Sequence, residues 1–326
     1  MRIVFFGTPE FAVPSLESIA REHEIALAVA QPDRPAGRGM KLHVPPVIER
    51  ARELGLATAQ PPKIRNAEFL DSIARLAPDA GIVVAYGKIL PAALLAIPKH
   101  GFFNVHGSIL PQYRGAAPIQ RAIEAGETMT GVTIMRVDEE LDHGPMLAVE
   151  TTEIGPDERT PALAQRLSHL GADALARVLR DVERGTAVET PQDHARATMA
   201  PKIEKSEGEI TFEEPASTIY DKFRAFDPWP GISFDGLKIT RCHPERSEGP
   251  ARAGHDAPAS QPHPSPGSLA PARDDIGAIL AIGDEGVVVA CGAGAIRLLE
   301  LQRPGKPRMP AAVVARGLGW RVGHVL

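Results

Sequence analysis

Short apolar runs alternate with segments of helical periodicity through the first 190 residues, and this alternation constrains the fold more than any other feature. The runs that predict strands are Ile3–Phe6, Ile25–Ala30, Ala80–Ala85, Gly101–Val105, Thr130–Val137 and Gly144–Thr152. Helices are predicted at Glu10–Glu22, Val47–Leu54, 117–125 and Leu163–Glu183, and a loop at 33–46. The pattern indicates an α/β domain with an open, mostly parallel, Rossmann-like sheet and helices on both faces.

The pattern loosens at residues 190–207, which we interpret as a linker. A chain of 326 residues is expected to form two domains, here 1–189 and 208–326. Beyond the linker, a helix is predicted at Ala216–Ala225 and strands at Leu237–Arg241, Gly277–Ile282, Gly286–Cys291 and Ala295–Leu301. Several short strands with glycine turns predict a small C-terminal β-barrel, which we expect to be OB-like.

Residues 242–274 interrupt this barrel pattern. The segment holds 33 residues with seven prolines, no aromatic residue and no apolar periodicity. Such a segment buries too little surface to offset the entropy of ordering, so a disordered insertion is predicted. We favour a neutral insertion over a binding arm.

Charge and cysteine content limit the classes of partner. The net charge is −5, so a nucleic acid could bind only at local basic patches. The two cysteines, Cys242 and Cys291, are too few for a disulfide framework and lack metal-ligand spacing. The apolar run Ile3–Phe6 is too short for a signal peptide, so none is expected, and no apolar stretch in the sequence reaches about 20 residues. We therefore expect a cytoplasmic protein with no membrane or DNA partner.

A cluster of polar residues follows the strand predicted at 101–105. Asn104 and His106 stand at its end, and Asp142 follows Asn104 by 38 residues. Ligands of such sheets bind beyond the carboxyl ends of the strands. An amide can donate to an oxyanion, an imidazole can shuttle a proton, and a carboxylate can orient the imidazole or relay the proton. The trio therefore favours acyl transfer between two amines without a covalent enzyme intermediate.

Two other interpretations of these residues exist. Asn104 or His106 alone could simply satisfy backbone groups at the end of a strand. His106, Asp142 and His143 could hold a metal ion, but no H-x-H, HExxH or Cys/His cluster accompanies them, and we expect no metal. The first strand is also not followed by G-x-G-x-x-G, which weighs against a dinucleotide-dependent dehydrogenase.

Several longer motifs resemble those of the 10-formyltetrahydrofolate-dependent formyltransferases. The motifs are Phe6–Phe11, Gln31–Gly39, Val84–Pro91, Asn104–Pro111, Tyr113–Gln120, Thr130–Met135, Leu141–Gly144 and Ala225–Pro230. The resemblance covers nearly the whole chain except about 242–274. It implies the formyltransferase fold and a formyl group carried by 10-formyltetrahydrofolate. It also implies that initiator methionyl-tRNA is the acceptor and that the protein is a monomer.

The resemblance also assigns roles to individual residues. The catalytic residues would be Asn104, His106 and Asp142. The folate-binding residues would be Ser108, Ile109, Leu110, Pro111, Tyr86, Gly87, Ile89 and Leu90, together with the loop around Asp142. Apolar side chains beside exposed backbone groups suit a flat heteroaromatic ring. For Ile89 and Leu90, an ordinary place in the core is the alternative.

Two cationic segments are predicted to contact tRNA. In this family the loop with Arg34, Arg38 and Lys41 resembles one that inserts at the acceptor end of initiator tRNA, although a solvated turn is the alternative. Residues 297–326 carry six Arg or Lys against one acid, a net charge of +5, within a chain of −5. From this segment Arg303, Lys306 and Arg308 are predicted to bind the phosphate backbone, with a solubilising surface as the alternative.

Related chemistry with another acceptor also remains open. A glycinamide ribonucleotide formyltransferase would lack the second domain and the Arg34–Lys41 loop. A sugar-nucleotide formyltransferase would join the same catalytic core to a different partner domain, and a formate-releasing hydrolase would use water as the acceptor. A non-catalytic tRNA- or folate-binding protein would need a broken trio, whereas all three members are present.

Overall fold

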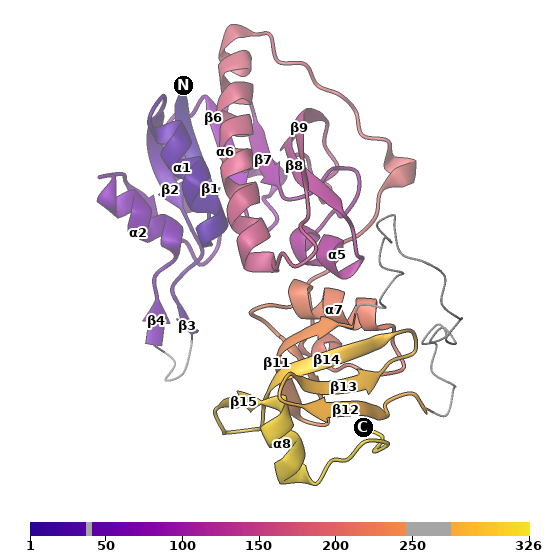
Figure 1. Cartoon of the computed structure of the whole chain (residues 1–326). Helices are drawn as coiled ribbons and strands as arrows, with labels where there is room; N and C mark the ends of the chain where they lie inside the picture. The colour runs from indigo at the N-terminus through magenta and orange to yellow at the C-terminus, as the bar shows by residue number, and fades with distance from the viewer. Residues whose placement is uncertain (37–40, 246–274) are drawn as a thin grey trace, which may run out of the picture. The chain divides into compact units, whose positions relative to one another are not determined.

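The computed structural model describes residues 1–36, 41–245 and 275–326. Its contacts divide the chain into two compact units (Figure 1). The first unit consists of Met1–Ala122 and Glu127–Lys202, and the second of Ile123–Gly126 and Ile203–Leu326.

The first unit is built on a seven-stranded sheet. Its strands are β1 (Arg2–Gly7), β2 (Glu24–Val29), β5 (Thr58–Ala59), β6 (Ala80–Val84), β7 (Phe102–His106), β8 (Met129–Arg136) and β9 (Met146–Glu153). They lie in the order β5-β2-β1-β6-β7-β8-β9. Neighbours from β5 to β7 are parallel, whereas β8 is antiparallel to both β7 and β9. The predicted mostly parallel sheet is confirmed, with an antiparallel pair at one edge.

Most helical segments of this unit lie between its strands in sequence, whereas α6 (Thr160–Arg184) and η2 (His194–Arg196) follow the last strand, β9. The others are η1 (Glu10–Ala12), α1 (Val13–Ala20), α2 (Pro46–Glu53), α3 (Ala67–Arg75), α4 (Ala92–Leu95) and α5 (Pro118–Glu124). The single helix predicted at Glu10–Glu22 is instead a 3₁₀ turn followed by α1. A proline in the first turn of α1 is favourable there, since that backbone position needs no N–H donor. Helices α3 and α4 were not predicted.

Alternate residues of β1 are buried on opposite faces of the sheet. Ile3 and Phe5 belong to one apolar cluster, which includes residues of α1 and α6. Val4 and Phe6 belong to a second cluster, which includes Phe69 of α3. Helices α1 and α6 lie side by side over the first of these faces (Figure 1). A strand with both faces buried reads as a continuous apolar run, which is why the sequence pattern located β1 correctly.

The predicted loop at 33–46 contains a short hairpin. Strands β3 (Arg34–Ala36) and β4 (Lys41–His43) pair antiparallel, with Ala36 opposite Lys41. Because each strand has only three residues and the segment has no apolar alternation, its sequence carries no strand signal.

The second unit contains a six-stranded antiparallel sheet. Its strands are β10 (Ile232–Phe234), β11 (Leu237–Pro244), β12 (Ile279–Gly283), β13 (Gly286–Ala290), β14 (Ala295–Gln302) and β15 (Arg308–Pro310). Their order is β10-β11-β14-β13-β12, and β15 pairs with β14. The helical segments are η3 (Lys205–Gly208), α7 (Ala216–Ala225) and α8 (Ala311–Leu318), of which only α7 was predicted. This sheet agrees with the small C-terminal barrel expected from the sequence.

Strand β11 extends into the segment that was predicted to be disordered. Cys242, His243 and Pro244 lie opposite Leu298, Arg297 and Ile296 of β14. Cys242 is buried and continues the row of inward-facing residues in β11, so that part of the prediction is wrong. The rest of the predicted insertion, residues 246–274, lies outside the described residues.

None of the helices in the described ranges combines the length and the hydropathy that a membrane-spanning helix requires.

Candidate active site

Strand β7 positions two of the three predicted catalytic residues. It lies between β6 and β8, and its residues Phe103 and Val105 are buried in the cluster beneath α6. Since successive side chains of a strand point to opposite faces, Asn104 and His106 share the other face. The strand therefore presents an amide and an imidazole side by side at its carboxyl end.

One nitrogen of the His106 ring is held by a backbone oxygen, and the other faces a carboxylate. Its side chain is 5% exposed, and its Nε2 lies 2.9 Å from the backbone oxygen of Tyr113. Because a carbonyl oxygen only accepts, Nε2 carries a hydrogen and donates it. The Nδ1 atom faces Asp142, with 3.6 Å to Oδ2. The Nδ1 atom is therefore the ring nitrogen that lies beside a carboxylate.

Asp142 completes the cluster from the loop between β8 and β9. Its Oδ2 accepts a hydrogen bond from the backbone N–H of Gly115 at 2.9 Å, and its Oδ1 accepts one from Nδ2 of Asn104 at 3.3 Å. Its φ angle is +49°, a left-handed conformation that is uncommon for residues other than glycine. Such conformations cluster at functional sites. The structure thus brings Asn104, His106 and Asp142 together.

Two glycines permit the close backbone approaches around this carboxylate. A Cβ atom on Gly144 would lie 2.0 Å from the backbone oxygen of Arg136. Gly115 has a φ of +122°, and a Cβ there would lie 2.8 Å from the backbone oxygen of Ala200. Only glycine fits either position without a shift of the backbone.

Two buried residues near Asp142 were not predicted from the sequence. Gln192 donates from Nε2 to the backbone oxygens of Asp142, at 2.9 Å, and Gly144, at 2.7 Å. Its Oε1 accepts from Arg114, at 2.6 Å from Nη2 and 3.2 Å from Nε. Arg114 lies inside the Tyr113–Gln120 motif, so the sequence did contain a sign that this residue matters. Gln192 lies in the predicted linker, where no motif marked it.

A pair of histidine rings borders the same loop. His143 and His194 stack with ring centroids 4.0 Å apart and planes inclined by 4°. His143 is hydrogen-bonded through Nδ1 to Asp138 at 2.7 Å, and Nη2 of Arg114 lies 2.8 Å from Nδ1 of His194. Nowhere in the described ranges does a group of three His, Cys, Asp or Glu side chains form a potential metal site.

The turn predicted to bind folate is tied closely to β8. The hydroxyl of Ser108 donates to the backbone oxygen of Gln112 at 2.6 Å. Thr133 links the turn to β8, since its hydroxyl donates to the backbone oxygen of Ser108 and accepts from the backbone N–H of Leu110. Ser108 and Leu110 are buried, whereas Ile109 and Pro111 are partly exposed. Only the latter pair offers side-chain surface to a ligand.

The second predicted folate-binding segment, residues 86–90, also contains both buried and exposed residues. Tyr86 is 1% exposed and packs edge-on against Phe6, with centroids 5.2 Å apart, and Leu90 is also buried. Burial raises the pKa of Tyr86 to about 12, and its hydroxyl has no hydrogen-bond partner among the described residues. Gly87 is exposed, and Ile89 is 61% exposed.

Ile89 lines a cavity of about 580 Å³ in the first unit. Its lining residues are Pro62, Lys63, Ile64, Arg65, Asn66, Lys88 and Ile89. Lys88 is fixed by a hydrogen bond from Nζ to the backbone oxygen of Pro62 at 3.1 Å. The cavity has the volume of a small-molecule site and combines an apolar side chain with three cations.

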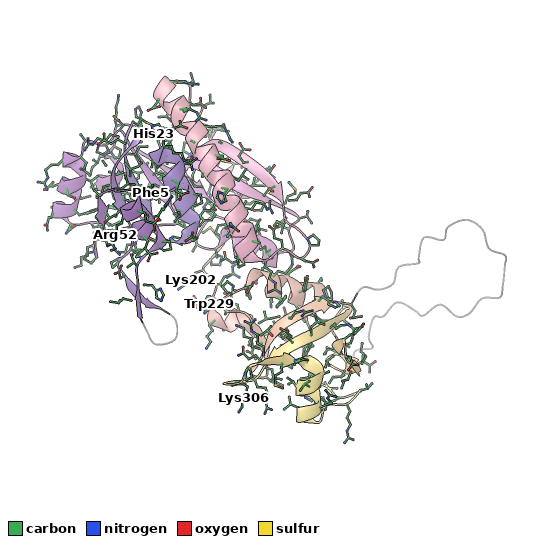
Figure 2. All side chains as sticks on the ribbon, turned by 60° about the vertical axis from the view of Figure 1, so that its left-hand side comes forward. Phe5, His23, Arg52, Lys202, Trp229 and Lys306 are labelled. Carbon is green, nitrogen blue, oxygen red and sulfur yellow. The ribbon has the colours of Figure 1, made fainter. Side chains whose placement is uncertain are left out.

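The residues predicted to contact tRNA lie in both units. Arg34 begins β3 and Lys41 begins β4, while Arg38 lies outside the described residues. Arg303, Lys306 and Arg308 are exposed at the turn from β14 to β15, and Figure 2 labels Lys306 there. Arg297 of the same basic segment is instead paired with Glu245 at 2.5 Å.

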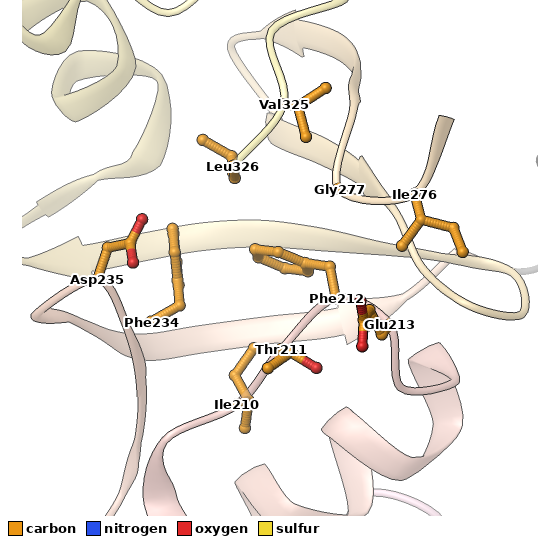
Figure 3. Close-up of a pocket in the computed structure, with 10 residues that line it drawn as sticks. All are labelled: Ile210, Thr211, Phe212, Glu213, Phe234, Asp235, Ile276, Gly277, Val325 and Leu326. Atoms are coloured by element: carbon orange, nitrogen blue, oxygen red, sulfur yellow. The ribbon is translucent and has the colours of Figure 1, made fainter. Parts of the chain in front are cut away.

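A second cavity, of about 670 Å³, lies in the C-terminal unit (Figure 3). The rings of Phe212 and Phe234 meet in its wall, 5.0 Å apart, and Glu213 and Asp235 add carboxylates to its lining. These two carboxylates give the lining of this cavity a negative charge, which disfavours phosphate.

Residues 1–179 match the family described as Formyl transferase, and residues 202–319 match the Formyl transferase C-terminal domain. Fold and site together therefore define a formyl-group transferase. The methionyl-tRNA formyltransferase of Thermus thermophilus is 42% identical over 323 residues, which cover 98% of this chain and 97% of that protein. The chain thus belongs to the formyl transferase family, among its methionyl-tRNA formyltransferases, as its sequence motifs predicted.

Solved structures share the fold at lower sequence identity. An N-formyltransferase from Helicobacter canadensis, in complex with folinic acid and dTDP-3-aminofucose, superposes with a TM-score of 0.64 at 16% identity, covering 91% of this chain and 98% of that one. HypX from Aquifex aeolicus, in complex with tetrahydrofolic acid, has a TM-score of 0.58 at 20% identity, covering 97% of this chain and 47% of that one. At these identities the likeness concerns the fold alone.

Proposed function

We propose that this chain transfers the formyl group of 10-formyltetrahydrofolate to the α-amine of methionyl-initiator tRNA and so produces N-formylmethionyl-tRNA. The observation that carries the proposal is the meeting of Asn104, His106 and Asp142 at the end of β7. The full-length relative from Thermus thermophilus, a methionyl-tRNA formyltransferase, supports formyl transfer to methionyl-tRNA.

Asn104 and the Asp142–His106 pair have different tasks in the transfer. As the amine attacks the formyl carbon, negative charge develops on the formyl oxygen, and the amide of Asn104 donates to that oxygen. Loss of one such donor typically lowers the rate about 10²- to 10³-fold. The proton of the attacking amine passes to Asp142, and from the Asp142–His106 pair to the departing nitrogen of the donor.

The amine itself must be neutral to attack. An α-amino group has a pKa of about 7.7–8.0, so a useful fraction is unprotonated near pH 7. A carboxylate fixed by Gly115 and Asn104 is a suitable acceptor for the proton that the amine then releases. The proposed route therefore needs neither a covalent intermediate nor an activated side-chain nucleophile.

The folate site is proposed at the exposed parts of the two segments described above. Ile109, Pro111, Gly87 and Ile89 offer apolar surface and backbone groups to a flat ring. The cavity beside Ile89 holds Lys63, Arg65 and Lys88, which suit the carboxylates of a folate. Ser108, Leu110, Tyr86 and Leu90 would support this surface from the core.

The tRNA would be held through phosphate contacts, with selection at its acceptor end. Arg303, Lys306 and Arg308 are proposed to bind the phosphate backbone, as exposed cations of the C-terminal unit. Arg34, Arg38 and Lys41 are proposed to contact the acceptor end, because their loop resembles the one that inserts there in this family. Initiator tRNA has a weak or missing first base pair, so its acceptor end opens at little cost and a loop can select it on that basis.

The proposal is tested by transfer of radiolabelled formyl from 10-formyltetrahydrofolate. Methionyl-initiator tRNA competes with elongator methionyl-tRNA, free methionine, glycinamide ribonucleotide and an amino-sugar nucleotide. Labelling of initiator tRNA alone is the expected result. Labelling of a small acceptor, or formate release without an acceptor, would refute the assignment of the acceptor and favour one of the related activities.

Selection of the initiator is tested separately. Arg38→Ala is expected to reduce formylation of methionyl-initiator tRNA more than it alters the KM for 10-formyltetrahydrofolate. An unchanged rate with initiator tRNA would remove Arg38 from the proposed acceptor-end contact.

A further inference from the structure

Residues 190–200 follow α6 and are attached to the candidate active site at two places. Thr190 and Met146 exchange two backbone hydrogen bonds of 2.8 Å. Further along, the backbone N–H of Arg114 donates to the backbone oxygen of Thr198 at 2.9 Å, and that of Ala200 donates to Arg114 at 2.7 Å. The first attachment is at the start of β9, directly after the Asp142 loop, and the second fixes the turn that supplies Gly115. The segment is therefore part of the site.

Gln192 is the buried side chain of this segment. It is 5% exposed, and both ends of its amide are used. The two N–H groups reach the backbone oxygens of Asp142 and Gly144, and Oε1 receives the two hydrogen bonds from Arg114. A primary amide has two donors and two acceptor positions, so every one of them is occupied here.

Arg114 adds a constraint on the direction of this amide. The residue is 8% exposed, and its guanidinium is directed at Oε1 of Gln192 and at Nδ1 of His194. Because a guanidinium only donates, it fixes which end of the amide points toward the Asp142 loop. The loop then receives N–H donors and not a repelling oxygen.

We propose that Gln192 is a positioning residue for formyl transfer, which acts through Asp142. It holds the backbone of Asp142 in its left-handed conformation, so that the carboxylate stays directed at Asn104 and His106. Gln192 does not itself reach the reacting atoms. The inference rests on the proposed function, because it concerns the residue that relays the proton in that reaction. Displacement of such a group by about 1 Å costs on the order of 10²-fold in rate.

The amide can be replaced in two informative ways. Gln192→Met has similar length without polar atoms, so the two backbone oxygens lose their donors. Gln192→Glu keeps the shape but turns an oxygen toward those same backbone oxygens. Gln165→Met is the matched control, since Gln165 is an exposed residue of α6.

The test is a double-mutant cycle on kcat for formylation of methionyl-initiator tRNA. In the wild-type background we expect Gln192→Met and Gln192→Glu to lower kcat by about 10- to 100-fold, with each KM within about twofold. In an Asp142→Asn background the same substitutions should lower kcat by less than about threefold, because a residue that acts through Asp142 has nothing left to position. Gln165→Met should change neither background.

Several outcomes would overturn the inference. Equal reductions of kcat in both backgrounds would show an effect that does not pass through Asp142, and an unchanged kcat would show none. Thermal unfolding identifies a Gln192 variant that has lost its fold, and the cycle is then evaluated with the other Gln192 variant. If the wild-type protein fails to formylate the tRNA, the proposed function fails. That result differs from equal reductions of kcat in the two backgrounds, which would refute only the role of Gln192.

Discussion

The Oδ2 atom of Asp142 accepts a hydrogen bond from the backbone N–H of Gly115 at 2.9 Å. The same oxygen lies 3.6 Å from Nδ1 of His106. A backbone N–H can only donate, so it favours an oxygen that accepts at this position. This carboxylate oxygen is thus held by a donor that is part of the backbone itself.

Asp142→Asn is expected to lower kcat for formylation by about 10²- to 10⁴-fold, since the amide cannot take up the proton that the carboxylate accepts. The control is Glu139→Gln, which removes the same charge from an exposed residue nearby. Steady-state formylation of methionyl-initiator tRNA measures both variants. Retention of wild-type kcat by Asp142→Asn would exclude Asp142 from the proton relay.

Gly144→Ala is expected to destabilise the protein by about 1–3 kcal/mol and to lower activity, because its Cβ would overlap the backbone oxygen of Arg136. Gly317→Ala is the contrasting change. Gly317 lies in α8, and a Cβ there would meet no neighbouring group within 4 Å, so alanine should stabilise the helix by about 0.5–1 kcal/mol. Denaturant unfolding and formylation assays compare the two, and equal stability changes would contradict the close approach at Gly144.

Replacement of Lys63 and Arg65 by glutamine is expected to raise the KM for 10-formyltetrahydrofolate about two- to fivefold, as for exposed ion pairs, while kcat stays near the wild-type value. Lys99→Gln serves as the control, because Lys99 is exposed and does not line the cavity. If both proteins show the same KM for the donor, the cavity beside Ile89 does not hold folate carboxylates.

Arg308→Gln is expected to weaken tRNA binding and to reduce the salt dependence of the affinity. Each lost phosphate contact should lower the slope of log K against log salt by about 1. Arg75→Gln, in α3, removes an exposed cation from the first unit and provides the comparison. Filter binding at several salt concentrations gives both slopes, and identical slopes would assign Arg308 to a merely solubilising surface.

Tyr86→Phe is expected to improve stability at alkaline pH. In the folded protein burial raises the pKa of Tyr86 from 10.0 to about 12, so the folded chain keeps its phenol proton where the unfolded chain loses it. This contribution is complete below about pH 10 and is lost as the pH rises toward 12. Unfolding curves at pH 7, 10 and 12 should therefore show a smaller alkaline loss in the variant than in the wild type. An equal loss would contradict the raised pKa.

The parallel strands, and the position of Asn104 and His106 on one face of β7, could be predicted from the sequence for a simple physical reason. A strand such as β1 that is buried on both faces appears as an unbroken apolar run, and side chains two residues apart in a strand must share a face. These relationships are local in sequence and need no knowledge of tertiary contacts.

The features that were missed depend on contacts between distant residues. Gln192 reaches Asp142 across 50 residues, and Arg114 reaches Gln192 across 78. A glutamine in a linker-like segment gives no local sign of such partners. The same holds for Cys242, whose place in β11 depends on pairing with Leu298 of a strand beyond the insertion.

The division of β1 between two apolar clusters has a consequence for how the chain tolerates change. Phe5 and Phe6 are adjacent in sequence but fill opposite sides of the sheet. A substitution of one ring disturbs the packing on one side of the sheet. Deletion of a single residue from β1 would instead turn every later side chain of the strand to the opposite face. Both layers would then be mispacked at once. The first unit should therefore accept changes of side-chain size along β1 far more readily than any change in its length.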